Sequence, residues 1–450
     1  MPAPPQPGAP GDDPEEPGEP GGGPFPFGGS SPFGGELDFS KVDFSKIDLS
    51  QLMRMLQSEG PVNWEVARQT AVWVALEGRP DPAVAPADHA RFEELAKAAQ
   101  TLVVGETGLA ATFATELRTV GPEGWVDLHL VALRPVLEAL ATNLGDTMKR
   151  AAAEADPEEQ AEAEAMLGAL PQGAFPFPLQ GMGSMLGMLA PMLLGIQAGS
   201  MIGYLAQHAL GRYDLPLPTG AAPLAGTEGG DAPSLCFVVS NIDRFEAEWS
   251  LPRDDLRFLV ALHETVHAAI RSVPWVRGLL VQLAIDYVSG YEVDPAGFEA
   301  EFGVIDPQDP SSIARMTEHP ERVLGAMQSA RQQRPLEELQ RLTSVMTGYA
   351  DVVLARIGRR LVPSYDRIHE AIARHRVERG EAERFIETLL GLRLTREHFD
   401  RGHAFCDGVV ERAGMEGLNR VWERAAMLPT PSELEAPGLW LARIDLPEQV

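Results

Sequence analysis

Apolar residues recur every three to four positions over most of the chain beyond residue 49, which is the spacing of one face of an α-helix. The clearest such segment, Arg253 to Ser272, reads RDDLRFLVALHETVHAAIRS, and its apolar surface is wide enough for a nearly buried helix. We expect Ser250 or Asp254 to cap the start of this helix, and Pro274 to end it. The rest of the chain is organised around this segment.

Similar periodicity predicts helices on both sides of it. Asn63 is a suitable N-cap for the first of them, and Asp88 for the second. The predicted helices cover residues 64 onward, 88–102, 125–150, 275–287, 321–333, 335–358 and most of 359–426, with a short tail after them. The acidic stretch 156–170 is either an exposed helix or a linker. Only the stretch from Leu235 to Ser240 has the short, partly β-branched composition of a strand. The predicted fold class is therefore mainly α and multi-helical, with at most a small β element before the helix at 253–272.

Residues 181 to 210 are almost entirely apolar and contain a stripe of small residues at Gly195, Gly199 and Gly203. This spacing is also found where transmembrane helices pack closely. Pro191 divides the stretch into two pieces that are each too short to cross a bilayer. We therefore favour two closely packed core helices, with the glycines against a neighbouring helix, over a membrane anchor. No membrane span is expected.

The helix at 253–272 contains His263-Glu264-Thr265-Val266-His267, an H-E-x-x-H sequence. Residues four apart share one helix face, so His263 and His267 can converge on one zinc ion, and Glu264 can act as a general base on a metal-bound water. The alternative is a pair of core histidines that interact with a helix carboxylate. The motif supplies only two ligands, whereas a catalytic zinc ion normally has three from the protein. Asp351, in the otherwise apolar segment 343–357, is the candidate for the third. The alternative is that Asp351 interacts with a nearby arginine, for instance Arg356 or Arg359.

The composition restricts the partners. A net charge of −28 argues against nucleic acid or an anionic membrane surface as a partner. Two cysteines far apart, with no basic and apolar leader, predict a cytoplasmic protein without a disulfide framework. We expect a disordered Pro/Gly-rich acidic tail at 1–35, a turn-rich connector at 36–60, an N-terminal helical part at 61–232 and a part carrying the motif helix at 233–450. The histidines at 369, 375, 398 and 403 lie among charged residues and are expected at the surface.

Between about Gly60 and Pro447 the chain resembles the bacterial zincin-like metallopeptidases. The segments that carry the resemblance are Gly60-Pro-Val-Asn-Trp, the glycine stripe leading to Tyr213-Asp-Leu-Pro-Leu-Pro, Val239-Ser-Asn-Ile, Leu262-His-Glu-Thr-Val-His with Pro274-Trp275, Leu389-Leu-Gly-Leu, and Leu428-Pro-Thr-Pro-Ser-Glu-Leu. The resemblance implies a zincin-like fold, a Zn²⁺ cofactor and a peptide or protein substrate.

One position departs from the family pattern. The resemblance implies a zinc-binding glutamate directly before Gly348 and an aspartate at the position of Asp351, which orients a ligand histidine. Position 347 is threonine in this chain. Thr347 is a poor zinc ligand, so either Asp351 enters the coordination shell, or another acid such as Glu292 serves, or the site is degenerate. The sequence thus predicts a zinc metallopeptidase, with a catalytically inactive zincin-fold scaffold or binding protein as the alternative.

Overall fold

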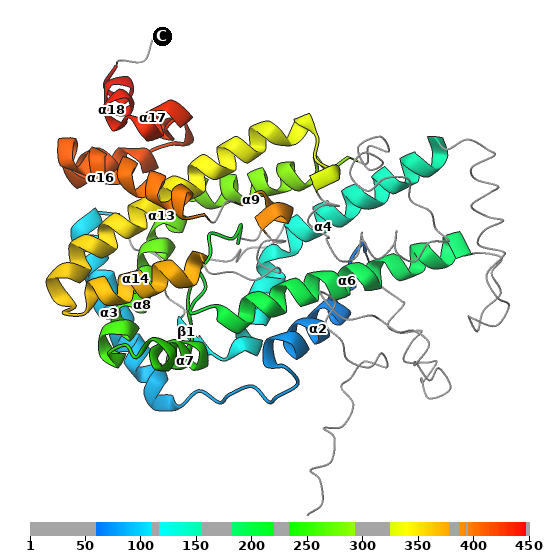
Figure 1. Cartoon of the computed structure of the whole chain (residues 1–450), viewed down its shortest axis with the longest axis horizontal. Helices are drawn as coiled ribbons and strands as arrows, with labels where there is room; N and C mark the ends of the chain where they lie inside the picture. Colours follow the sequence, from blue (N-terminus) through cyan, green and yellow to red (C-terminus); the bar gives the residue numbers. More distant parts are fainter. Residues whose placement is uncertain are drawn as a thin grey trace, which may run out of the picture.

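The computed structural model of the chain describes residues 60–109, 117–154, 182–219, 234–292, 325–377, 387–392 and 395–446. The predicted tail, nearly all of the connector, the helix or linker at 156–170 and the first four residues of the helix predicted at 321–333 lie outside these residues. The rest of that predicted helix, residues 325–333, does not form one continuous helix, and its last part is the 3₁₀ turn Ala330–Gln332 before a helix that begins at Gln333. Helices dominate the described part, and two short strands form a parallel pair (Figure 1). The prediction of a mainly α fold is confirmed.

The helices are α2 (Trp64–Leu76), α3 (Pro86–Thr107), α4 (Pro122–Glu154), α6 (Met182–His208), α7 (Val239–Trp249), α8 (Arg253–Ser272), α9 (Pro274–Val288), α13 (Gln333–Leu361), α14 (Tyr365–Val377), α16 (Arg396–Asn419), α17 (Pro431–Glu435) and α18 (Pro437–Asp445). Three-residue 3₁₀ turns lie at η3 (Ala330–Gln332), η4 (Arg420–Trp422) and η5 (Ala425–Met427). Strand β1 (Leu117–Val120) runs parallel to β2 (Leu235–Val238), with Leu117 opposite Leu235. The strand at 235 was predicted and its partner was not.

Two of the predicted helix caps are wrong. Helix α3 begins at Pro86, whose fixed φ suits a first helical position, so Asp88 lies in the first turn. Its carboxylate accepts a hydrogen bond from Arg257 on α8 at 2.7 Å. At the start of α8 the N-cap position is Pro252, which has no capping side chain. Ser250 instead ends α7 in the left-handed conformation, with φ 50°.

Other helix ends agree with the prediction. The Asn63 side chain accepts a hydrogen bond from the Val66 N–H at 3.1 Å, which caps α2. Helix α8 ends at Ser272, and Pro274 begins α9 across a bend of 89°. The C-terminal tail was predicted without helices, but two short ones form there. The Thr430 and Glu433 side chains make a capping box that starts α17, a signal that is present in the sequence.

Helix α6 runs through Pro191 as one helix, so the prediction of two helices is wrong. It packs lengthwise on α2 (Figure 1). This contact outweighs the cost of about 3 kcal/mol that an interior proline carries. The predicted glycine face is confirmed, because Gly195, Gly199 and Gly203 lie directly on the α2 backbone. A Cβ at Gly195 or Gly203 would meet the carbonyl oxygen of Asn63 or Ala71 at 2.5 and 2.6 Å.

Within the described residues, no single helix has both the length and the apolar composition needed to cross a membrane. Among the described helices, only the pair α8 and α9 together passes such a test, and the two are sharply bent at Val273. Most side chains of α8 are buried inside the protein, including its charged Arg257, Glu264 and Arg271. The apolar composition of this pair is therefore that of a core element.

Helix α8 lies at the centre of the fold, packed by α3, α13, α9 and β2. One continuous apolar core includes residues from before and after residue 232. The division of the chain into two parts near that residue stays a prediction.

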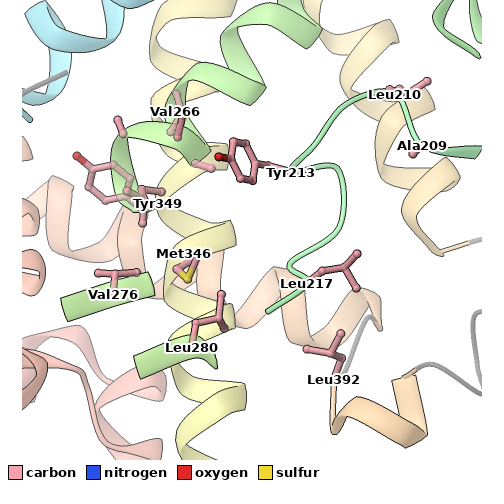
Figure 2. Close-up of a cluster of buried hydrophobic side chains, with 14 of the residues drawn as sticks. Ala209, Leu210, Tyr213, Leu217, Val266, Val276, Leu280, Met346, Tyr349 and Leu392 are labelled. Carbon is pink, nitrogen blue, oxygen red and sulfur yellow. The ribbon is translucent and has the colours of Figure 1, made fainter. Parts of the chain in front are cut away.

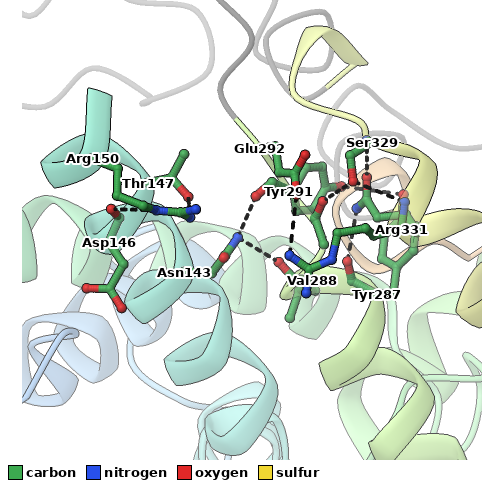
Figure 3. A network of polar contacts seen from close by, with 12 residues as sticks. Asn143, Asp146, Thr147, Arg150, Tyr287, Val288, Tyr291, Glu292, Ser329 and Arg331 are labelled. Carbon is green, nitrogen blue, oxygen red and sulfur yellow. Dashed lines mark hydrogen bonds and ion pairs between the residues drawn. The ribbon is translucent and has the colours of Figure 1, made fainter. Parts of the chain in front are cut away.

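Helix α4 is tied to the segment that follows α9. The Asn143 amide of α4 donates to the Tyr291 carbonyl at 2.8 Å (Figure 3).

Helices α13 and α16 approach each other through two glycines. A Cβ on Gly348 would collide with the Gly402 carbonyl and would lie 2.7 Å from the His403 nitrogen. A Cβ on Gly402 would in turn collide with the Ser344 carbonyl. Backbone therefore rests on backbone at this crossing.

Candidate functional site

The three chemical residues of the motif are buried together in the middle of α8. His263, Glu264 and His267 are 6%, 1% and 2% exposed. The two imidazole rings have centroids 4.5 Å apart and planes inclined by 57°, as the four-residue spacing predicts. The Nδ1 atom of His263 lies 3.5 Å from the Glu264 carboxyl oxygen Oε1.

The Glu264 carboxyl group is held by a backbone segment that crosses α8. The N–H groups of Arg212 and Tyr213 donate to it at 2.8 and 3.0 Å. Gly211 precedes them, and a Cβ there would lie 2.6 Å from Glu264 Oε1, so only glycine allows this approach. Burial raises the pKa of Glu264 to about 8, although the two N–H donors oppose this shift. Near neutral pH the group is mainly a protonated acid.

The backbone segment at residues 210–213, which contacts Glu264, is held in place by strand β2 and helix α4. Gly211 forms an antiparallel bridge with Phe237, and the Val238 N–H donates to the Leu210 carbonyl at 3.0 Å, so the segment extends the sheet beside β2. The indole N–H of Trp125 donates to the Gly211 carbonyl at 2.8 Å. The His129 ring stacks on Trp125, with its Nε2 atom 3.3 Å from the Arg212 carbonyl oxygen. Sequence reasoning missed these contacts, since no local signal links α4 to residues 211–213.

Trp125→Phe is expected to lower the free energy of unfolding by about 1–3 kcal/mol, because the buried Gly211 carbonyl loses its donor. Chemical denaturation monitored by circular dichroism would measure this. Trp275→Phe is the matched control, since its indole N–H also donates to a carbonyl, that of Trp422, far from Glu264. Both variants should lose stability, but only Trp125→Phe should speed hydrogen exchange of the Tyr213 amide. Equal exchange in the two variants would contradict the support assigned to Trp125.

His267 faces a buried cation. The Arg271 Nη1 group lies 3.2 Å from His267 Nδ1, one helical turn further along α8. A guanidinium can only donate, so Nδ1 is the acceptor, and the neutral ring then carries its proton on Nε2. An imidazole in this tautomer has no lone pair left for a metal ion. Zinc-bound histidines show the opposite arrangement, in which the second ring nitrogen donates to a carboxylate or carbonyl group.

His263 opens onto a cavity of about 460 Å³ between four helices. Asp351 of α13 is 8% exposed and lines the same cavity, with His369 from α14 and His403 from α16. The structure thus places the predicted third-ligand candidate in one cavity with the first motif histidine. Of the two arginines considered as partners of Asp351, Arg356 pairs with Glu106, and Arg359 lies 3.5 Å from Asp366.

The expected surface position of the C-terminal histidines is only partly correct. His398 is buried, and its Nε2 atom lies 3.3 Å from the Thr343 hydroxyl of α13. His375 is partly exposed, with its Nε2 atom 3.0 Å from the His208 carbonyl oxygen. His369 and His403 were expected to be surface residues because charged residues surround them in the sequence, yet both line the cavity. The positions of α14 and α16 against α13 are tertiary features that local composition does not reveal.

Neither other candidate ligand is directed toward a metal site. The Thr347 hydroxyl donates to the carbonyl groups of Thr343 and Ser344 in its own helix, at 2.9 and 3.1 Å. Glu292 lies beside Tyr291 near the end of α9, where it pairs with Arg331 at 3.3 Å (Figure 3). Among the described residues, no group of three His, Cys, Asp or Glu side chains is arranged to hold a metal ion.

These observations bear on the zinc ion that the motif predicts. His263 and His267 have the right spacing, but His267 accepts from a cation and position 347 supplies no carboxylate. In this arrangement the donor set does not make a catalytic zinc site. The assignment of His263 and His267 as ligands, and of Glu264 as the base, stays a prediction.

Comparison with known proteins places the chain in a family. Residues 62–441 match the family model of the zincin-like metallopeptidases, so the chain belongs to that family, as its sequence indicated. Among solved structures, the chain is similar to a protein from Chloroflexus aurantiacus that is provisionally described as a hydrolase with a novel fold. The match has 23% identity and a TM-score of 0.55, over 86% of this chain and 99% of the other. At this identity it shows the fold. No match is found among curated proteins.

Proposed function

We propose that this chain is a ligand-binding member of the zincin-like metallopeptidases that does not carry out zinc-dependent hydrolysis. The proposed partner is a peptide or protein segment that enters the cavity lined by His263, Asp351, His369 and His403, and the proposed location is the cytoplasm. The observation that carries the proposal is the hydrogen bond from Arg271 to His267 Nδ1, because it removes the lone pair that a zinc ion requires.

Two further features support the same conclusion. Glu264 would have to accept a proton from water to act as a general base, but burial raises its pKa to about 8 and two backbone N–H groups hold the carboxyl group. Thr347 stands where the family pattern has a ligand carboxylate, and its hydroxyl is bonded within α13. Loss of the base and loss of the third ligand are separate changes, and both remove hydrolytic chemistry.

A zinc-dependent peptidase is the second candidate. The observation in its favour is that His263 and Asp351 line one cavity, so a substrate there would contact both the motif and a carboxylate. In this candidate His263, His267 and Asp351 hold the ion, and Glu264 is the base. It requires His267 to part from Arg271, and Glu264 to be freed from residues 212–213.

Metal analysis of the purified chain separates the two candidates. After equilibration with zinc and desalting, the wild type is expected to retain much less than one zinc ion per chain, and His263→Ala should retain the same amount. A peptide-library assay should show no cleavage above the Glu264→Ala background. One zinc ion per chain that is lost in His263→Ala would refute the proposal and establish the second candidate.

Thr347→Glu tests the missing ligand directly, with Thr347→Gln as a control of the same size without charge. The added carboxylate is expected to tighten zinc binding by roughly tenfold or more, about 1.4 kcal/mol, because a hard anionic donor is added beside His263. Calorimetric titration with zinc would measure the change. Equal affinities in the Glu and Gln variants would show that position 347 does not face the histidines.

A further inference from the structure

Arg271 is a buried cation whose hydrogen-bonding capacity is only partly used. It lies in the last turn of α8 and is 2% exposed. Its Nη1 atom interacts with His267, whereas its Nε and Nη2 groups have no hydrogen-bond partner within the described part of the chain. Leaving the donors of a buried charge without acceptors costs more free energy than leaving neutral donors unpaired. Such a cost favours an acceptor at these two groups.

The two unused groups have a defined geometry. In a planar guanidinium, the Nε–H and the neighbouring Nη–H point in nearly the same direction and form a two-pronged fork. The oxygens of a carboxylate match the spacing of this fork, and the resulting paired bonds are among the strongest hydrogen bonds in proteins. Arg271 therefore presents the recognition element for a carboxylate, while its third nitrogen is anchored to α8.

The charge around Arg271 also favours an anion. Arg212 is 4% exposed and donates to the Ser234 hydroxyl, and its guanidinium carbon lies 5.6 Å from the Tyr213 ring centroid. The guanidinium carbon of Arg271 lies 4.6 Å from the same ring, so two buried cations share one aromatic side chain. Figure 2 shows the Tyr213 ring directed from its backbone segment toward α8. A guanidinium group keeps its charge at neutral pH. The Glu264 carboxyl group beside this pair accepts from the Arg212 and Tyr213 N–H groups.

We infer that Arg271 is the anchor of a carboxylate-binding site, in which a planar carboxylate accepts from Nε and Nη2 beside the Tyr213 ring. The ligand is either a small organic acid or the C-terminal carboxylate of a peptide. The inference goes beyond the proposed function, because the site is at Arg271, which does not line the cavity of His263, Asp351, His369 and His403. A chain of net charge −28 repels anions in general, so a specific response to a carboxylate reports a local site.

Thermal unfolding of the full chain in sodium acetate tests the inference, with sodium chloride at equal ionic strength and acetamide as references. Acetamide has nearly the shape of acetate but no charge. Acetate is expected to raise the melting temperature of the wild type in a saturable way, whereas the two references should not. Arg271→Gln should abolish the acetate response. Arg244→Gln removes a half-exposed arginine on α7 and should keep it.

The source of the carboxylate is distinguished by a second pair of probes, a tripeptide with a free C-terminus and its C-terminal amide. Stabilisation by acetate but not by the tripeptide acid assigns the site to small acids, and stabilisation by the tripeptide acid but not its amide assigns it to peptide C-termini. If Arg271→Gln does not fold, the wild-type Arg271 Nε–H resonance is followed by NMR during acetate titration. Absence of an acetate response in both measurements, or an equal response to chloride, would overturn the inference, whatever the outcome of the zinc analysis.

Discussion

Glu264→Gln is expected to remove a strong pH dependence from the stability of this chain. In the unfolded chain the carboxyl group loses its proton near pH 4.5, whereas in the folded protein burial raises its pKa to about 8. The folded state then binds one proton more between these values, so the free energy of unfolding falls as the pH rises through this window. At 1.36 kcal/mol per pKa unit, the loss reaches up to roughly 5 kcal/mol.

Glutamine keeps an oxygen that can accept from the Arg212 and Tyr213 N–H groups but does not titrate. The stability of the wild type relative to Glu264→Gln should therefore decline steadily from pH 5 to pH 8 in urea unfolding experiments, and level off above pH 8. Taking the difference between the two proteins cancels the contribution of the large net negative charge. A difference that stays constant over this range would mean that the folded protein holds Glu264 as a carboxylate, which would return the general-base role to consideration.

Gly199→Ala is expected to destabilise the protein strongly. A Cβ at this position would collide with the Ala67 carbonyl and would lie 2.8 Å from the Thr70 Cβ, both on α2. The backbone of α2 cannot give way as a flexible side chain would, so the two helices must separate. We expect a loss of about 1–3 kcal/mol in the free energy of unfolding, and a larger loss for Gly199→Leu.

Gly105→Ala is the matched control, since Gly105 is also within a helix but has nothing within 4 Å of a Cβ. Alanine favours the helix there by up to about 1 kcal/mol, so this variant should gain stability. Urea unfolding at one pH would compare both variants with the wild type. If Gly199→Ala were as stable as Gly105→Ala, the close packing of α6 on α2 would be wrong.

The sequence was sufficient to predict the mainly α fold, the motif helix and the glycine contact, because each follows from local spacing. Residues three and four apart share a helix face in any fold, so the rings of His263 and His267 lie side by side once this segment is helical. Asp88 shows the limit of such reasoning. Aspartate is a preferred N-cap residue, but Asp88 forms a long-range ion pair with Arg257, and the helix begins two residues earlier at Pro86.

The environment of the motif could not be predicted in the same way. The Glu264 carboxyl group is held by the backbone N–H groups of Arg212 and Tyr213, which lie about fifty residues before it in the sequence. Backbone N–H groups are present in nearly every residue type, so the identities of residues 212 and 213 give no sign of this contact. Arg271 stands four residues after His267 and was visible in the sequence, but its contact with Nδ1 rather than with solvent depends on burial. His369 and His403 reach the cavity through the packing of α14 and α16.

The glycine crossing of α13 and α16 has a consequence for how the cavity selects its ligand. Gly348 and Gly402 let two backbones rest on each other, and these helices also carry Asp351 and His403. Backbone atoms in contact cannot slide or rotate as side chains can, so the separation of these two walls is set before any ligand arrives. We therefore expect a ligand to bind with little rearrangement of these two walls, so that the protein loses little conformational entropy on binding. A ligand wider than the cavity should bind more weakly, because the walls cannot move apart to accommodate it.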